Sequence, residues 1–203
     1  MGYQEIWAPW RLAYVTSTEK KSEDLSKDLV FPEGADPNCF ICQAAADGPE
    51  HDAARYVLQR NEHSLVIMNR YPYNNGHLLI TPRRHVGRLE QLTREEHLEL
   101  METLSRIVPM MERIMNCDGF NVGLNLGRVA GAGLPGHLHW HLVPRWNGDT
   151  NFMPVLACTN VIPQSMEALW EVSVKFEEVN DNGELESLGI RLFPAESESQ
   201  TEK

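Results

Sequence analysis

Three histidines alternate with apolar residues in the segment 137–143, which reads HLHWHLV. In a β-strand, alternate side chains point to opposite faces. His137, His139 and His141 would then share one face, at about 6.6–7 Å between successive side chains, while the residues between them enter the core. Two kinds of chemistry use such a row of imidazoles: they can bind a metal ion, or one of them can act as a nucleophile.

The loop that precedes this segment favours the nucleophile. Residues 127–136 read GRVAGAGLPG and contain four glycines. Because glycine permits a positive φ and close approach of the backbone, exposed amides in such a loop can point at an anion. A glycine-rich loop that leads directly into three histidines therefore indicates phosphate chemistry with an imidazole nucleophile.

A second candidate site is the pair Cys39 and Cys42, which are separated by two residues. This spacing is typical of zinc knuckles, but one such pair supplies only half of a four-ligand site. A redox-active pair and two unpaired buried thiols are the alternatives. Cys117 and Cys158 have no neighbouring cysteine and are expected to be core or free thiols.

Alternating segments separated by short links predict an antiparallel sheet, and hence an α+β protein. The residues 71–75, YPYNN, interrupt the pattern as a turn and make the flanking strands a hairpin. The expected strands cover residues 56–60, 64–69, 77–81, 120–126 and 137–143.

Two helices are expected to pack with this sheet. Thr93 and Glu96 form a capping box, which opens a helix whose apolar residues recur at helical spacing as far as Met115. Pro109 should kink that helix. A last helix is expected over residues 165–176.

The length of 203 residues and the hydrophobic content of 42% fit one domain, which we expect over residues 1–176 with a polar loop at 16–38. Residues 177–203 contain eight acidic and two basic side chains and are expected to form an acidic, largely disordered tail. No apolar run approaches the ~18 residues of a membrane span, and a secretory signal is not expected. The few cysteines favour a cytoplasmic protein.

A net charge of −11 argues against binding to nucleic acid or to an anionic membrane. The charge is distributed unevenly, however. The segments 69–88 and 119–148 contain six arginines and no Asp, Glu or Lys. We therefore expect a locally basic site that attracts a compact polyphosphate, on a protein whose surface repels longer polyanions.

The motifs resemble those of the histidine triad (HIT) family. HLHWHLV matches the signature His-φ-His-φ-His-φ-φ, in which φ is an apolar residue. IMNRYPYNNGHLLITPRRH is similar to the family's hairpin, and GFNVGLNLG to its next strand. WAPWR, the two cysteines and VPRWNGDTNFMPV are similar to the bacterial branch that contains diadenosine tetraphosphate phosphorylases. The resemblance implies a sheet of about five antiparallel strands, a long helix across it, a C-terminal helix and a homodimer.

The resemblance also implies roles for individual residues. His139 would be the nucleophile, His141 would contact the phosphate or the bridging oxygen, and His77 would lie beside the phosphate. Asn69 would bind the ribose and Asn125 the phosphate. The further nucleotide ligands expected are the backbone of Gly131, Ala132 and Gly133, and the side chain of Arg145.

In zinc-bearing relatives, the Pro-x-x-His histidine and the first histidine of the triad complete the metal site with the two cysteines. Here those positions are His85 and His137. The resemblance thus implies a structural zinc held by Cys39, Cys42, His85 and His137, which would tie the N-terminal part of the domain to the catalytic strand.

The reaction implied is nucleotidyl transfer from a dinucleoside polyphosphate, through a nucleotidyl-histidine, to inorganic phosphate. Many family members carry Gln or Ser in the loop that here reads GAGLPG, so this loop offers no polar side chain to assist the leaving group. Hydrolysis of dinucleoside polyphosphates or nucleoside phosphoramidates, and nucleotide binding without catalysis, are the alternatives. A site of three histidines bound to a catalytic metal is a further alternative.

Overall fold

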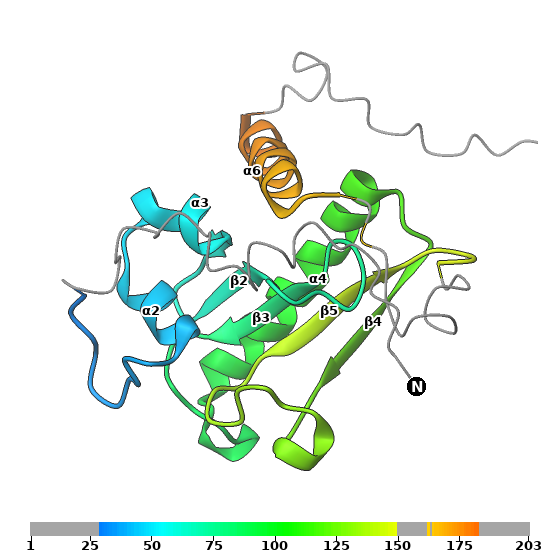
Figure 1. Cartoon of the computed structure of the whole chain (residues 1–203). Helices are drawn as coiled ribbons and strands as arrows, with labels where there is room; N and C mark the ends of the chain where they lie inside the picture. Colours follow the sequence, from blue (N-terminus) through cyan, green and yellow to red (C-terminus); the bar gives the residue numbers. More distant parts are fainter. Residues whose placement is uncertain (1–28, 150–161, 163, 183–203) are drawn as a thin grey trace, which may run out of the picture.

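The computed structural model describes residues 29–149, 162 and 164–182 (Figure 1). Several sequence features lie outside the described residues: the WAPWR segment, most of the polar loop expected at 16–38, Cys158 and residues 183–203 of the tail expected at 177–203. The first six residues of that expected tail, 177–182, are helical, because the last helix continues to Asn182 and does not end at residue 176. None of the helices in the described ranges is long and apolar enough to cross a membrane.

Five strands form one antiparallel sheet in the order β1-β2-β3-β5-β4, so the expected α+β fold is confirmed (Figure 1). The chain order is reversed for the last two strands, which places β5 in the interior of the sheet and β4 at its edge. The strands are β1 (Val57–Arg60), β2 (Ser64–Met68), β3 (Leu78–Pro82), β4 (Gly119–Leu124) and β5 (Trp140–Arg145).

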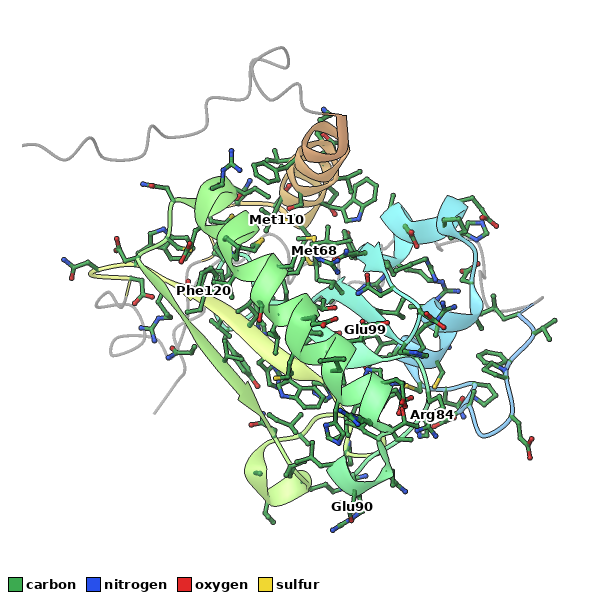
Figure 2. The ribbon with its side chains drawn as sticks, turned by 180° about the vertical axis from the view of Figure 1, so that it is seen from behind. Met68, Arg84, Glu90, Glu99, Met110 and Phe120 are labelled. Atoms are coloured by element: carbon green, nitrogen blue, oxygen red, sulfur yellow. The ribbon has the colours of Figure 1, made fainter. Side chains whose placement is uncertain are left out.

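The long helix α4 (Arg94–Met115) crosses one face of the sheet, as Figure 2 shows from behind. Its start is the expected capping box: the Thr93 side chain accepts from the Glu96 N–H, and the Glu96 carboxylate accepts from the Thr93 N–H. The helix continues through Pro109 to Met115, so the proline does not end it. The C-terminal helix α6 (Met166–Asn182) contacts both α4 and β1.

Alternation along the strands divides the core between the two faces of the sheet. On one face, Val66 and Met68 of β2 and Leu142 of β5 pack in the cluster beneath α4. On the other face, Leu65 and Ile67 of β2 pack against α2 (Phe40–Ala46). Both faces of β2 and β3 are buried, so this pair of strands lies at the centre of the core.

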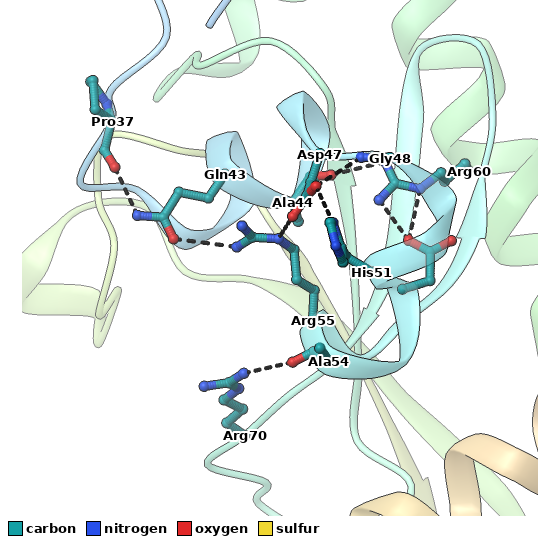
Figure 3. A network of polar contacts seen from close by, with 11 residues as sticks. Pro37, Gln43, Ala44, Asp47, Gly48, His51, Ala54, Arg55, Arg60 and Arg70 are labelled. Carbon is teal, nitrogen blue, oxygen red and sulfur yellow. Dashed lines mark hydrogen bonds and ion pairs between the residues drawn. The ribbon is translucent and has the colours of Figure 1, made fainter. Parts of the chain in front are cut away.

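The segment between α2 and β1 is folded into short helices that the sequence pattern did not predict: η1 (Pro49–His51) and α3 (Asp52–Arg55). The Asp47 carboxylate holds them together, because it accepts hydrogen bonds from the His51 ring (2.7 Å), the Arg55 guanidinium and the Gly48 amide (Figure 3). Helices this short depend on such tertiary contacts, since isolated helices of this length are unstable.

The strand expected at 137–143 begins three residues later, at Trp140. The β3–β5 pairing covers only Leu78 to Ile80 on β3, opposite Leu142 to Trp140 on β5. Pro82 ends β3 and has no N–H to donate to a continuing ladder. His137 and His139 therefore lie in the segment before β5, with His137 at a bend. The backbone of this segment is held instead by the Leu138 N–H, which donates to the Val86 carbonyl at 2.7 Å.

Candidate active site

The candidate site lies on the sheet face opposite α4. Leu138 and Leu142 belong to the core beneath that helix, so the alternate residues His139 and His141 point to the other face. Leu79 of β3 pairs with His141 in the sheet. The rings of His139 and His141 are 5.1 Å apart between centroids, and those of His77 and His141 are 5.0 Å apart.

His139 is held with one ring nitrogen directed at the backbone. Its Nδ1 lies 2.8 Å from the carbonyl oxygen of His137. A carbonyl only accepts, so Nδ1 carries the proton, and the neutral ring keeps its lone pair on Nε2. The side chain is 8% exposed, which limits its freedom to reorient. This is the arrangement that an imidazole nucleophile requires.

His141 is oriented through His77. The backbone N–H of Tyr73 donates to His77 Nδ1 at 3.0 Å, so a neutral His77 carries its proton on Nε2. His77 Nε2 is 2.9 Å from His141 Nδ1 and donates to it. A neutral His141 must then carry its own proton on Nε2. The chain of donors therefore ends in an N–H beside the nucleophile.

Burial keeps this pair of rings neutral. Burial, followed by the charges that His141 and His139 would carry, lowers the pKa of His77 from 6.5 to about 3. Burial and the neighbouring His139 also lower the pKa of His141. Near neutral pH the donor chain from Tyr73 to His141 is consequently one of uncharged rings with assigned protons.

Asn125 lies at the open end of this chain. Its amide group is 3.3 Å from His141 Nε2. Since that nitrogen carries a proton, the amide presents its oxygen there when the group is turned about its terminal bond. The glycine-rich loop is next to it, because a Cβ on Gly131 would lie 3.6 Å from the Asn125 amide nitrogen. The loop, Asn125 and His141 are thus brought together.

Two of the three expected loop amides are used within the loop itself. The N–H of Gly131 donates to the carbonyl of Arg128, and that of Ala132 donates to the carbonyl of Gly127. In the part of the chain that the structure describes, no backbone acceptor is found for the N–H of Gly133. The contacts of these residues with a nucleotide stay predictions.

Asn69 lies beside His77 at the start of the turn. Its amide nitrogen is 3.3 Å from His77 Nδ1, and its oxygen accepts from the Tyr71 N–H at 2.9 Å. The side chain therefore organises the turn in this structure. Its proposed contact with a ribose stays a prediction.

Three of the six arginines in the motif segments form ion pairs with carboxylates. Arg84 makes a bidentate ion pair with the buried Glu96, and Arg88 pairs with Glu90. Arg145 pairs with Asp149 at 2.5 and 2.8 Å. Three of the six arginine charges are thus offset by carboxylates. Because these carboxylates lie outside the segments 69–88 and 119–148, the positive charge expected from the two segments is reduced.

Cys39, Cys42, His85 and His137 form one cluster, in which all four ligand atoms lie within 4.8 Å of one another. Cys39 Sγ is 3.3 Å from His137 Nδ1, and Cys42 Sγ is 3.2 Å from His85 Nδ1. A tetrahedral zinc with sulfur and nitrogen ligands places them about 3.5 Å apart, so the donor set fits this ion.

The surroundings of the cluster suit a metal site. His137 Nε2 donates to the carbonyl of Pro82 at 2.9 Å, which leaves Nδ1 unprotonated toward the cysteines. Burial raises the pKa of the Cys39 thiol to about 12, so a bound cation is needed to hold it as a thiolate. A Cβ on Gly136 would lie 3.1 Å from His85 Nε2, so glycine lets the loop pass this ring.

The three histidines of the motif are therefore divided between two sites. His137 joins the cysteines, while His141 contacts both His77 and His139. Among the described residues, no potential metal group includes both His139 and His141, which leaves the alternative of a three-histidine metal site without support.

The chain is similar to known proteins. A family model described as the HIT domain matches residues 50–148. An AP-4-A phosphorylase of Mycobacterium tuberculosis (strain H37Rv) is 38% identical over 161 residues, which cover 79% of this chain and 77% of that protein. The chain belongs to the histidine triad (HIT) family. The resemblance to the phosphorylase-containing bacterial branch is confirmed as well.

Other proteins match a smaller part of the chain. An asymmetrical bis(5'-nucleosyl)-tetraphosphatase of Schizosaccharomyces pombe is 32% identical over 93 residues, 46% of this chain and 50% of that protein. The crystal structure of a zinc-bound HIT protein from Mycobacterium smegmatis covers 63% of this chain and 87% of its own, with 23% identity and a TM-score of 0.52. The structural likeness confirms the HIT fold.

One residue of the HIT site was missed from the sequence. The sequence pattern places Tyr73 only in a turn. In the structure its backbone N–H donates to His77, and its ring centroid lies 4.7 Å from that of His77. The turn precedes His77 by only a few residues, so its nearness in sequence was a signal. The direction of the Tyr73 N–H was not readable from residue types.

Proposed function

We propose that this HIT protein transfers a nucleotidyl group from a dinucleoside polyphosphate to inorganic phosphate. The observation that carries the proposal is the hydrogen bond from His139 Nδ1 to the His137 carbonyl, which leaves Nε2 as a nucleophile. The 38% identity to an AP-4-A phosphorylase over 79% of the chain supports diadenosine tetraphosphate as the substrate.

In the first step, His139 Nε2 attacks the α-phosphorus of the substrate. A P–N bond forms, and the bond from that phosphorus to the bridging oxygen breaks, releasing ATP. The His141 Nε2–H hydrogen-bonds the oxygen on which negative charge develops and stabilises it. In the second step, phosphate attacks the same phosphorus, the P–N bond breaks, ADP leaves, and His139 recovers its lone pair.

Hydrolysis is the second candidate. The Schizosaccharomyces pombe relative named as a tetraphosphatase supports it over the 46% of the chain that it matches. The loop at 131–136 has no polar side chain that would select between water and phosphate as the acceptor. The acceptor must therefore be identified by experiment.

The decisive measurement is product analysis with diadenosine tetraphosphate, with and without inorganic phosphate. We expect ADP and ATP, formed only when phosphate is present. AMP and ATP formed without phosphate would instead establish the hydrolase. A protein that binds the dinucleotide and forms no product under either condition would have a binding role only.

We propose that a structural zinc ion is held by Cys39, Cys42, His85 and His137. These four ligands would occupy all of its coordination positions and leave none open for substrate. When bound, the ion would cross-link α2, the segment after β3 and the segment before β5. The thiolates that it requires favour a reducing compartment, which supports the cytoplasm as the location.

A homodimer is proposed through β4, the edge strand next to β5. Asn121, Val122 and Gly123 on this strand are exposed, whereas the opposite edge strand, β1, is in contact with α6 and α3. An edge of this kind is open to pairing with a second copy. Light scattering should give twice the chain mass of 23.1 kDa, and a mass of one chain would contradict the dimer.

A further inference from the structure

The turn before β3 is tied to the segment after β5. Asn74 Nδ2 donates to the Pro144 carbonyl at 3.1 Å and to Asp149 Oδ2 at 2.9 Å. Arg145 holds the same carboxylate with its Nε and Nη2 atoms, at 2.5 and 2.8 Å. The proposed function assigns no role to Asn74 or Asp149. Arg145 forms an ion pair with Asp149 in this structure.

The segment that supplies Asp149 is itself anchored to the end of α4. Trp146 Nε1 donates to the Asn116 carbonyl at 2.9 Å, and the Asn147 N–H donates to Asp118 Oδ2 at 2.6 Å. Asp149 therefore stands on a support that is independent of the turn. A contact with it restrains the turn relative to the rest of the domain.

The turn also packs closely against this end of the sheet. Gly76 has φ +73°, and a Cβ there would lie 3.1 Å from Met115 Cε and from Pro144 Cγ. Only glycine combines this backbone conformation with the space available. The end of the turn is therefore packed tightly between α4 and β5, directly before His77.

The turn carries Tyr73, which contacts both histidines of the donor chain. Its ring centroid lies 4.7 Å from that of His77 and 5.4 Å from that of His141, tilted by 36° and 32°. Its backbone N–H donates to His77 Nδ1. Tyr73 is thus the connection between the tie at Asn74 and the proton positions of the site.

We propose that Asn74, Asp149 and Arg145 form a clamp that positions Tyr73, and through its amide determines which ring nitrogens of His77 and His141 carry protons. The proposal rests on the proposed function for its consequence in catalysis. It joins the turn at residues 71–75 and the segment at residues 144–149 in one structural unit. Arg145 then positions the turn and is not a phosphate ligand.

The consequence follows from the direction of the hydrogen bonds. With the clamp intact, His77 donates from Nε2 and His141 presents an N–H to the substrate. When the turn is displaced, His77 Nδ1 loses the Tyr73 amide and keeps only the longer contact with Asn69 Nδ2, at 3.3 Å. His77 can then also carry its proton on Nδ1 and accept at Nε2. His141 then donates from Nδ1 and presents a lone pair, which repels the phosphate oxygen that it should stabilise.

The test compares Asn74→Ala and Asp149→Asn with the control Asn121→Ala. Asn121 also binds Arg145, at 2.7 Å, but takes no part in the tie to the turn. Nitrogen-15 NMR of the histidine rings, recorded without substrate, reports which nitrogen is protonated. We expect His77 protonated at Nε2 in the wild type and in Asn121→Ala, and a mixture of both forms in the two clamp variants.

Kinetics with diadenosine tetraphosphate provide the second readout. We expect kcat to fall by about tenfold to a hundredfold in Asn74→Ala, with KM changed by less than about twofold, because proton placement contributes to the transition state. Asp149→Asn keeps an oxygen acceptor and should lose less. Equal losses in the Asn121→Ala control would overturn the clamp.

The two proposals fail separately. Unchanged His77 protonation in both clamp variants overturns the clamp even when the wild-type enzyme is active. Altered protonation in a protein that never processes the dinucleotide supports the clamp and removes the proposed function instead. Should Asn74→Ala not fold, Asp149→Asn and the same spectra decide the question.

Discussion

Replacing His139 with alanine is expected to reduce turnover of diadenosine tetraphosphate by about four orders of magnitude or more, because the covalent route loses its nucleophile. The side chain is almost completely buried, and its Nδ1 donates to the backbone carbonyl of His137. Its removal should leave the rest of the donor chain in place, so we expect the variant to fold and to bind the dinucleotide.

Chemical rescue separates a nucleophile from a structural role. In His139→Gly, added imidazole can occupy the vacated space and attack the phosphorus in place of the side chain. We expect activity to recover with imidazole concentration in His139→Gly but not in His141→Gly. His97→Ala, on the exposed surface of α4, is the matched control and should retain full activity.

The intermediate itself should be visible by mass. With substrate and no phosphate, denaturation under alkaline conditions should preserve the P–N bond and give a protein heavier by one adenylyl group. Substantial turnover by His139→Ala would exclude His139 as the nucleophile, whatever the products.

The second large effect is expected from loss of the metal ligands. Cys42→Ser should remove one zinc per chain and lower the free energy of unfolding by about 4 kcal/mol at a free zinc concentration 1,000 times the dissociation constant. Cys42 Sγ lies within 3.5 Å of the Nδ1 atoms of both His85 and His137. Replacing this one residue therefore removes a ligand that contacts both histidines of the cluster.

Metal analysis and denaturant unfolding, with and without a chelator, measure both effects. The wild type should become less stable with the chelator, and Cys42→Ser should show no difference. Cys117→Ser is the control, because this cysteine lies outside the cluster. Zinc retained by Cys42→Ser, or zinc lost from His139→Ala and His141→Ala, would contradict the assignment.

Loss of zinc should also lower activity, through the backbone. The carbonyl of His137 accepts from His139 Nδ1, while the ring of His137 belongs to the metal cluster. A ring that is no longer held by the ion leaves residue 137 less restrained. The orientation of the nucleophile is then less well defined, and we expect kcat to fall more than affinity.

The sequence by itself determined the chemistry-bearing residues and most of the secondary structure. Alternation and turn residues predicted all five strands of the sheet, and the capping box placed the start of α4 at the observed residue. These predictions succeed because hydrophobic periodicity, helix caps and turns depend on residues that are close together in the sequence. The resemblance to the HIT family added the partners of Cys39 and Cys42, which lie tens of residues away.

Tertiary structure decided how those residues are divided and aimed. A strict strand would have kept the three histidines in one row, but Pro82 stops the pairing with β3, and His137 turns to the cysteines. Arginine count indicated a basic site, yet Arg84 and Arg145 meet carboxylates that their segments do not contain. The proton on His77 depends on where the Tyr73 N–H points. Such hydrogen-bond directions and ion pairs arise only when the packed chain brings distant groups together, so residue type and spacing did not reveal them.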